Sequence, residues 1–353
     1  MDHLAVTVPL AAAVAMLYAR LAASSIRPGL RRLLALAPVL VLLVLLPFAI
    51  PLYSIRGTAA FFLVWLGEFK LLLLAAGRGP LHPALPPLPF VFTAALPVKL
   101  LEHRSRRPDG AKTTTTTTAA ALPLLLSSTA IKVAVLVVLV HLLRGKDRMH
   151  LYAAFTLYGV FTYCFLDSVL PCLAALGRAL GMELEPQFDR PYLSASLRDF
   201  WGRRWNLMAS AVLRPAVYDP VRARRGAAAG VLATFLVSGL MHEVVAFYLT
   251  ERAPTGKLTA FFLLHGAAVC AERWCARRCA ARPPRAVATL LVVGFVAGTA
   301  FWLFFPPLFG GGVDDLFFAE ASAFVSAVAD AGGRLLRLRP AGLARWSATY
   351  VPG

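Results

Sequence analysis

The chain has 353 residues, of which 59% are hydrophobic and only 15% are charged. In soluble domains about a quarter of all residues are charged, so this composition excludes a soluble globular protein. The net charge of +18 is typical of basic residues gathered in cytosolic loops and at lipid headgroups. Because no basic stripe lies on a soluble domain, the charge does not indicate nucleic-acid binding.

Several apolar runs approach or exceed the about 20 residues that cross the core of a bilayer as a helix. These runs are too long and unbroken for barrel strands, so the sequence predicts an all-α, multi-spanning membrane bundle forming a single domain, 1–353. The expected spans are 4–23, 31–53, 58–77, 120–143, 151–177, 226–250, 258–276 and 286–309. Two further runs bring the total to eight to ten. The run 83–101 holds five prolines and is kinked or re-entrant, and 316–332 is short.

The distribution of arginine predicts part of the topology. Basic residues follow the first apolar run instead of preceding it, which favours an uncleaved first span with the N-terminus outside the cytosol. The segment 178–225 holds nine arginines and five acidic residues, and the loop 277–285 holds four arginines. We therefore expect both to lie on the cytosolic side.

The stretch "SLRDFWGRRWNLM" (196–208) is unusually polar for its surroundings and contains Asn206, the only asparagine of the chain. Ser196 and Asp199 fit a capping box, which predicts a helix starting at Leu197. Helical spacing then gives two faces. The largely apolar face holds Leu197, Phe200, Trp201, Arg204, Trp205 and Met208, and the polar face holds Asp199, Arg203, Asn206 and Ser210. The pattern predicts an amphipathic helix at the membrane interface.

His242 and Glu243 lie near the middle of the apolar run 226–250. Ionisable groups at that depth are costly and usually face a polar cavity or a partner, which indicates a functional site. The alternative is a neutral histidine satisfied by a neighbouring carbonyl or by Ser238, one turn earlier. A zinc protease is excluded, because "HEVVA" has Ala246 where H-E-x-x-H needs its second histidine.

Other polar groups lie in apolar runs. His265 and Glu272 share a helix face two turns apart, and they either touch substrate or serve helix pairing, with Gly266 permitting close approach. Glu68 and Lys70 are not helix neighbours, so each needs a partner elsewhere. No Walker loop, G-x-G-x-x-G, G-x-S-x-G or Cys/His cluster occurs, so we expect neither a metal nor a cofactor.

The run "ELEPQFDRPYLSASLRDFWGRRWNLMASAVLRPAVYDPVR", followed by "GLMHE" and "FFLLHG", resembles the plant wax synthases. These are long-chain-alcohol O-fatty-acyltransferases of the membrane-bound O-acyltransferase superfamily. The resemblance covers essentially the whole chain and is densest over 183–272. It implies transfer of an acyl group from acyl-CoA, as co-substrate, to a long-chain alcohol in the endoplasmic reticulum membrane.

Carried over by motif, the resemblance implies that His242 in "GLMHE" and Asn206 in "DFWGRRWN" are the catalytic residues. A neutral His242 would take the proton of the alcohol, and Asn206 would orient the thioester or stabilise the developing oxyanion. We therefore expect Asn206 to face the same cavity as His242. The candidates for substrate binding are Arg203 and Arg204, which suit CoA phosphates, together with Asp199, Trp201, Trp205, Glu243 and His265.

Three alternatives stay open at this stage. The acceptor could be a sterol, since plant relatives of wax synthases include sterol acyltransferases. The chain could be a proton-coupled transporter that uses His242, Glu243, Glu68 and Lys70 as a relay, although the repeated halves of many transporters are not visible. A non-catalytic membrane scaffold would leave the buried histidine and the single asparagine unexplained.

Overall fold

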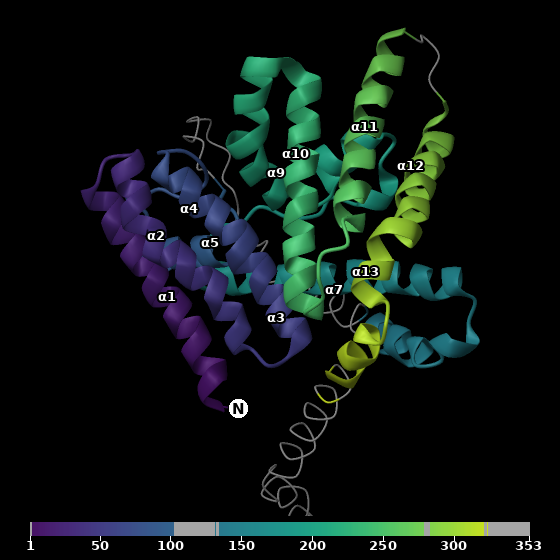
Figure 1. Cartoon of the computed structure of the whole chain (residues 1–353), viewed down its shortest axis with the longest axis horizontal. Coiled ribbons are helices and arrows are strands. Elements are labelled where there is room, and N and C mark those ends of the chain that lie inside the picture. Colours follow the sequence, from purple (N-terminus) through teal and green to yellow (C-terminus); the bar gives the residue numbers. More distant parts are fainter. Residues whose placement is uncertain (1, 102–130, 132–133, 279–282, 321–322, 324–353) are drawn as a thin grey trace, which may run out of the picture.

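The structure is a computed structural model that describes residues 2–101, 131, 134–278, 283–320 and 323. Within these ranges the chain is helical and contains no strand, apart from an isolated antiparallel bridge between Leu100 and Leu184. The predicted all-α class is therefore confirmed. Figure 1 shows two groups of helices, an N-terminal group in purple and blue and a later group in green and yellow, with α10 between them.

The N-terminal group consists of α1 (Asp2–Ser25), α2 (Leu30–Leu45), α3 (Tyr53–Ala59), α4 (Glu68–Ala75) and α5 (Pro87–Ala95). A 3-10 turn, η1 (Leu46–Ala49), ends the second helix, and a π-helical stretch, η2 (Ala60–Gly67), joins α3 to α4. Buried aliphatic side chains of α1, α2, α4 and α5 form one core, with Met16, Leu36 and Leu71 completely inaccessible. Large apolar residues on the outer faces of α1 and α2 stay exposed, as a lipid-facing surface requires.

Among the described residues, six helical runs are long and apolar enough to cross a membrane. They are Val6–Ser25, Leu30–Ala49, Tyr53–Ala75, Leu151–Ala179, Leu207–Thr250 and Arg285–Phe309. These runs agree with six of the eight predicted spans, and α11 (Lys257–Arg278) forms where a seventh was expected but is less apolar than the others. The helix α5 has only 9 residues, about 14 Å of rise, so the run 83–101 does not cross a bilayer as one straight helix.

Two predicted spans fall partly outside the described residues. Of 120–143 only residue 131 and the short apolar helix Ala134–Leu143 are described, and of 316–332 only residues 316–320 and 323. The total of eight to ten spans therefore stays a prediction.

The run Leu207–Thr250 is a helical hairpin. It begins with α9 (Leu207–Leu213), continues through the π-helical η6 (Arg214–Tyr218) and ends with α10 (Asp219–Thr250). Gly226 breaks the run with a φ of +86°, a left-handed region that favours glycine. The chain reverses there, and Tyr218 packs against Gly230. In Figure 1 the two limbs stand side by side. The exposed Arg222, Arg224 and Arg225 come shortly before Gly226 in the sequence.

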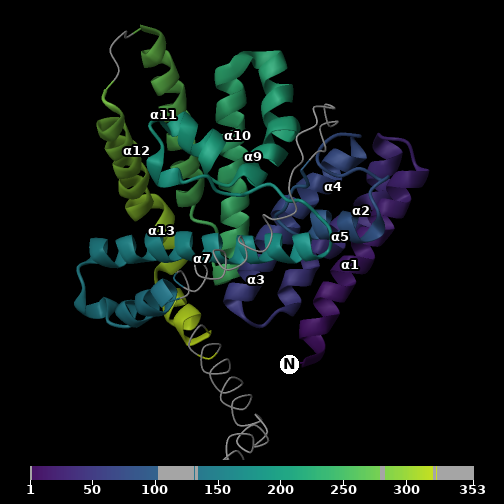
Figure 2. The ribbon, with the colours of Figure 1, turned by 180° about the vertical axis from the view of Figure 1, so that it is seen from behind.

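The helix α11 packs along α10 with close backbone approach. A Cβ atom at Gly239 would lie 2.7 Å from the Cα of Thr259, and one at Gly266 would lie 2.9 Å from the Cβ of Phe235. The close packing predicted at Gly266 is therefore confirmed. Figure 2, which views the bundle from behind, shows the same order of α10, α11 and α12 (Arg285–Thr299).

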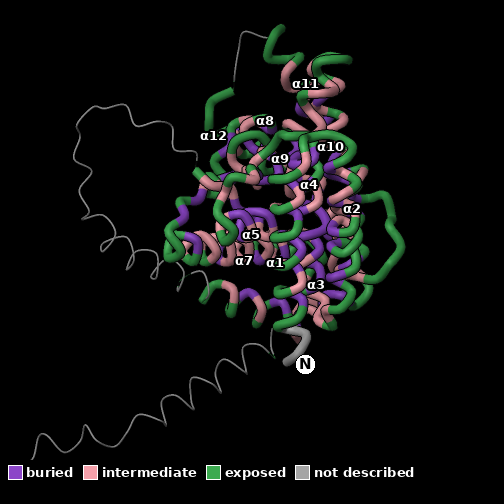
Figure 3. Tube along the Cα trace, turned by 90° about the vertical axis from the view of Figure 1, so that its left-hand side faces the viewer, coloured by how far each residue is buried: buried purple, intermediate pink, exposed green. Residues whose placement is uncertain are grey.

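The helix α7 (Leu151–Ala179) runs crosswise to α10 and α11 (Figure 1). It packs against the chain that follows α12, which is the π-helical η7 (Ala300–Phe304) and α13 (Phe305–Phe309). The contact is aromatic: the ring of Tyr158 stacks on that of Phe309 with their centroids 4.3 Å apart. Figure 3 shows that buried residues gather where the helices meet and that exposed residues follow the outside, including the far end of α11.

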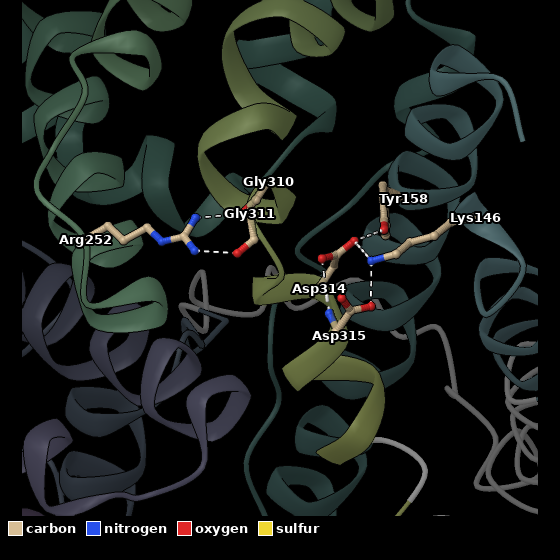
Figure 4. Close-up of polar contacts among 7 residues, drawn as sticks. All are labelled: Lys146, Tyr158, Arg252, Gly310, Gly311, Asp314 and Asp315. Atoms are coloured by element: carbon tan, nitrogen blue, oxygen red, sulfur yellow. Dashed lines mark hydrogen bonds and ion pairs between the residues drawn. The ribbon is translucent and has the colours of Figure 1, made fainter. Parts of the chain in front are cut away.

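Polar contacts tie the helix ends together at the end of the bundle where α10 finishes. Asp314 accepts hydrogen bonds from Lys146 and from the hydroxyl of Tyr158, and Lys146 also contacts Asp315 at 2.6 Å (Figure 4). In the same view the guanidinium of Arg252 donates to the carbonyls of Gly310 and Gly311. These contacts join the start of α7, the loop after α10 and the segment after α13.

Candidate active site

The imidazole of His242 lies half-buried on α10 with one nitrogen committed and one not. Its Nδ1 is 2.7 Å from the carbonyl oxygen of Ser238, one turn earlier. A carbonyl only accepts, so Nδ1 carries the proton and the lone pair of the neutral ring is on Nε2. The sequence left open that His242 is only a structural histidine paired with a neighbouring carbonyl. That carbonyl contact is present, but it uses Nδ1 alone. Among the described residues no hydrogen bond reaches Nε2.

Aromatic side chains from three elements surround His242. Its ring stacks on Phe262 of α11, with centroids 4.2 Å apart and planes 30° apart. The indole of Trp65 in η2 meets it edge to face at 4.6 Å, and Phe304 of η7 lies at 5.9 Å. These contacts fix the ring in apolar surroundings, where an uncharged imidazole is strongly favoured over a charged one. A neutral, oriented imidazole with a free lone pair is suited to general-base chemistry.

Glu243, the neighbour of His242, points elsewhere. Its buried carboxylate accepts hydrogen bonds from the backbone N–H groups of Thr255, Leu258 and Thr259, over 3.1, 2.9 and 3.2 Å. Two of these donors lie in the first turn of α11, where a negative charge also interacts favourably with the positive end of the helix dipole. The contacts give Glu243 the task of capping α11.

The interfacial motif starts as predicted but does not continue as one helix. The hydroxyl of Ser196 accepts from the N–H of Asp199 at 2.9 Å, and α8 (Leu197–Asp199) begins at Leu197. The chain continues as a π-helix, η5 (Phe200–Arg204), and becomes extended at Trp205. The single helix expected through Ser210 is therefore wrong. The expected polar face, with Asp199, Arg203, Asn206 and Ser210 in register, is wrong for the same reason.

Asn206 is where the helix breaks, and the reason is local. Its backbone is left-handed, with φ +45° and ψ +66°, a conformation that asparagine tolerates better than most residues. From there its Oδ1 accepts from the N–H of Ala209 at 3.1 Å and caps the new helix α9. The amide Nδ2 has no hydrogen bond among the described residues, so its two donors remain available.

Gln187 completes the cap of α9 and was not among the predicted site residues. Its carbonyl accepts from the N–H of Leu207, and its side-chain Oε1 accepts from the N–H of Met208, each at 3.0 Å. All three leading N–H groups of α9 are thus paired by two amide residues. That Gln187 is the only glutamine of the chain was the one available signal.

The two arginines predicted to meet CoA differ in their surroundings. Arg204 donates to the carboxylate of Asp199 at 2.7 Å and to the carbonyl of Asp189 at 3.0 Å, so it holds the loop before the motif. Arg203 is exposed and forms no ion pair among the described residues. Arg203 is therefore the better placed of the two for an outside phosphate.

The other residues predicted to bind substrate, Trp201, Trp205 and His265, contact one another or neighbouring core side chains. The indole N–H of Trp201 donates to Nδ1 of His265 at 3.0 Å, and Nε2 of His265 lies 2.9 Å from the hydroxyl of Thr299. Trp205 stacks on Phe200, with centroids 5.5 Å apart. The carboxylate of Glu272 accepts from the backbone of Leu197 and Arg198 at the start of α8, at 3.0 and 3.1 Å.

Lys70 and Glu68 do not pair with each other in the structure. Lys70 is fully buried, and its ammonium donates to the carbonyls of Thr93 and Leu96, each at 2.6 Å. These carbonyls end α5, where the helix dipole is negative. Glu68 is not its partner, since the Oε1 atom of Glu68 is buried and has no hydrogen bond among the described residues.

No hydrogen bond joins Asn206 and His242 in the described part of the chain. The residues beside them do share a cluster: Met208 and Met241 pack into the same apolar core as Trp65. The expected common cavity therefore stays a prediction.

His242 thus lies half-buried among aromatic rings, with one nitrogen hydrogen-bonded, inside a helical bundle whose described part holds six runs long and apolar enough to cross a membrane. Residues 184–264, which contain both motifs, match the membrane bound O-acyl transferase family. The chain belongs to this family and is an O-acyltransferase.

Curated relatives cover most of the chain. It is 39% identical to the probable long-chain-alcohol O-fatty-acyltransferase 1 of Arabidopsis thaliana, over 84% of this chain and 88% of that one. It is also 39% identical to the long-chain-alcohol O-fatty-acyltransferase of Simmondsia chinensis, over 81% and 84%. An acyl-CoA–sterol O-acyltransferase 1 of Arabidopsis thaliana is 35% identical over 83% and 87%.

Proposed function

We propose that the protein transfers a fatty acyl group from acyl-CoA to a long-chain fatty alcohol, forming a wax ester and free CoA. The names of its relatives support this substrate pair. The observation that carries the mechanism is the hydrogen bond between Nδ1 of His242 and the carbonyl of Ser238. It leaves the lone pair of Nε2 free to act as a base among apolar side chains.

The chemistry needs one proton acceptor and no redox step. Nε2 of His242 takes the hydroxyl proton as the alcohol oxygen attacks the thioester carbonyl carbon. The new C–O bond forms, the tetrahedral intermediate collapses, and the C–S bond breaks. The imidazolium then returns its proton to the departing CoA sulfur, so no cofactor is required. The alcohol and the acyl chain both partition into lipid, which suits a site inside a membrane bundle.

Asn206 and Arg203 complete the proposal. The free Nδ2 of Asn206 is a donor for the thioester oxygen as it becomes an oxyanion, while its Oδ1 stays on the cap of α9. Exposed Arg203 binds the phosphates of CoA, the only strongly charged part of either substrate. The proposed location is the endoplasmic reticulum membrane, with this arginine on the cytosolic side where acyl-CoA is found.

The test uses membranes from a host that expresses the protein and lacks its own wax ester synthesis. Labelled acyl-CoA is supplied with a fatty alcohol, and the esters are separated. We expect His242→Ala to abolish ester formation while the protein stays in the membrane at a normal level. His141→Ala is the matched control, because His141 is exposed. Near-normal synthesis by the His242 variant would contradict the proposed mechanism.

A sterol acceptor is the second candidate, favoured by the similarity to the sterol acyltransferase. The same assay with a sterol in place of the fatty alcohol separates the two. Faster esterification of the sterol than of the alcohol by the wild-type protein would replace the proposed acceptor and leave the role of His242 in place.

A further inference from the structure

Two tryptophan–histidine ring pairs occur among the described residues, and they differ in their hydrogen bonds. In the first, the indole N–H of Trp201 donates to Nδ1 of His265, and the imidazole is paired on both sides. In the second, Trp65 and His242 are in closer ring contact, with centroids 4.6 Å apart against 5.3 Å, but no hydrogen bond joins them. The second pair therefore holds two unused groups of opposite kind.

The unused donor is the indole Nε1–H of Trp65. The residue is only 1% exposed, and Nε1 is a buried atom with no hydrogen-bond partner among the described residues. Leaving such a donor unpaired is unfavourable, so a buried N–H without a partner in a folded protein calls for an explanation. The unused acceptor is Nε2 of His242, whose lone pair is left free by the Nδ1 contact with Ser238.

The backbone that carries Trp65 supports a functional explanation. Trp65 lies in η2, the eight-residue π-helical stretch, and its ring is held between Phe61, at 4.9 Å, and His242. π-Helical turns frequently occur at functional sites, because the extra residue per turn redirects side chains, and η2 is one of four such stretches in the described residues.

Only one reacting group complements both unused atoms. A thioester carbonyl has acceptors only, and it could use the indole N–H but not the lone pair of Nε2. A hydroxyl is both acceptor and donor, and it could receive the indole N–H on its oxygen while giving its proton to Nε2. We propose that Trp65 and His242 form a two-point subsite for the hydroxyl of the acceptor alcohol, with Trp65 holding the oxygen that attacks. The inference rests on the proposed function and assigns its acceptor side.

The test is Trp65→Phe, which removes the N–H and keeps an aromatic ring. We expect KM for the fatty alcohol to rise roughly three- to tenfold, the effect of one hydrogen bond, with KM for acyl-CoA unchanged. Trp302→Phe, at a 70% exposed position, controls for loss of an indole, and Phe61→Leu controls for loosened packing around Trp65. A Trp65→Phe enzyme with unchanged KM for the alcohol, or with the same profile as Phe61→Leu, would overturn the subsite.

A second measurement does not depend on turnover. An alkyl methyl ether offers an oxygen acceptor without a hydroxyl proton, so it can use the Trp65 donor but not the His242 base. We expect its inhibition constant against the alcohol to rise in Trp65→Phe by the same factor as KM. An unchanged inhibition constant would count against the proposed contact. The outcomes separate the two proposals: a fully active His242→Ala contradicts the proposed mechanism, whereas an inactive His242→Ala with a normal Trp65→Phe contradicts only the subsite.

Discussion

The indole of Trp201 and the imidazole of His265 are joined by a 3.0 Å hydrogen bond in which His265 is the acceptor. Since Nε2 of His265 lies against the Thr299 hydroxyl, which itself donates to the carbonyl of Phe295, the chain of hydrogen bonds ends on the backbone of α12. His265 is completely buried. His265 thus ties η5, α11 and α12 together and has no nitrogen left for a substrate.

We therefore expect His265→Ala to weaken the fold more than the chemistry. The change leaves the Trp201 N–H unpaired and opens a cavity, and the unpaired donor alone costs about 1–3 kcal/mol. Thermal unfolding in detergent should show a lower Tm, and membranes should contain less protein. Turnover per folded molecule should stay within a few-fold of wild type. A normal Tm with a turnover about 100-fold lower would instead mean that His265 acts in catalysis.

Two substitutions of Asn206 should separate its two roles. Asn206→Asp keeps an oxygen for the cap of α9 and tolerates the left-handed backbone, but it loses the Nδ2 donor. We expect its Tm to match the wild type while kcat falls about 10²–10³-fold. Asn206→Ala loses the cap as well and should also lower stability by about 1 kcal/mol. Full activity in Asn206→Asp would restrict Asn206 to its structural role.

The two arginines of the motif should give opposite results. Arg203→Gln removes an exposed charge, so we expect a higher KM for acyl-CoA, a weaker dependence of that KM on salt, and an unchanged Tm. Arg204→Gln breaks the contacts with Asp199 and with the carbonyl of Asp189, so its main effect should be a lower Tm. Finding that only Arg204→Gln changes the KM for acyl-CoA would reverse the assignment.

The Asp314 cluster should make stability depend on pH. Burial alone would raise the pKa of Asp314, but hydrogen bonds from Lys146 and Tyr158 outweigh it and hold that pKa below its usual value of 3.8. A carboxyl with a lowered folded pKa stabilises the protein above its unfolded pKa, and this contribution is lost as pH falls through the folded pKa. Asp314→Asn should lower the Tm at neutral pH, and the difference from wild type should shrink in acid. Asp315→Asn, at a more exposed carboxylate, should have the smaller effect.

The sequence predicted the class of fold well because hydropathy is a local property. Runs of about twenty apolar residues need no knowledge of their neighbours, and six of the predicted spans reappear as long apolar helices. The start of α8 was also predictable, since Ser196 and Asp199 are three residues apart and the cap they form is local. His242 was found in the same way, as a polar residue in an apolar run.

What failed depended on backbone conformation and distant partners. Helical spacing placed Asn206 in line with Asp199, but the left-handed turn at Asn206 ends that register, and nothing in the spacing signals it. The tasks of Glu243 and Glu272 could not be predicted, because their partners lie 12 to 16 and 74 to 75 residues away. Trp65 was missed because a tryptophan in an apolar run looks like an ordinary membrane residue until its N–H is seen to be unpaired.

The carboxylate that starts α8 belongs to Glu272, 75 residues further along the chain. A ribosome adds about 5–20 residues per second, so roughly 4–15 seconds separate the synthesis of Leu197 from that of its partner. During that interval the motif that carries Asn206 has been synthesised, while the backbone amides at its start lack their carboxylate. A chain truncated within α11 before Glu272 would contain every residue proposed to touch substrate and still leave the backbone N–H groups of Leu197 and Arg198 without this acceptor.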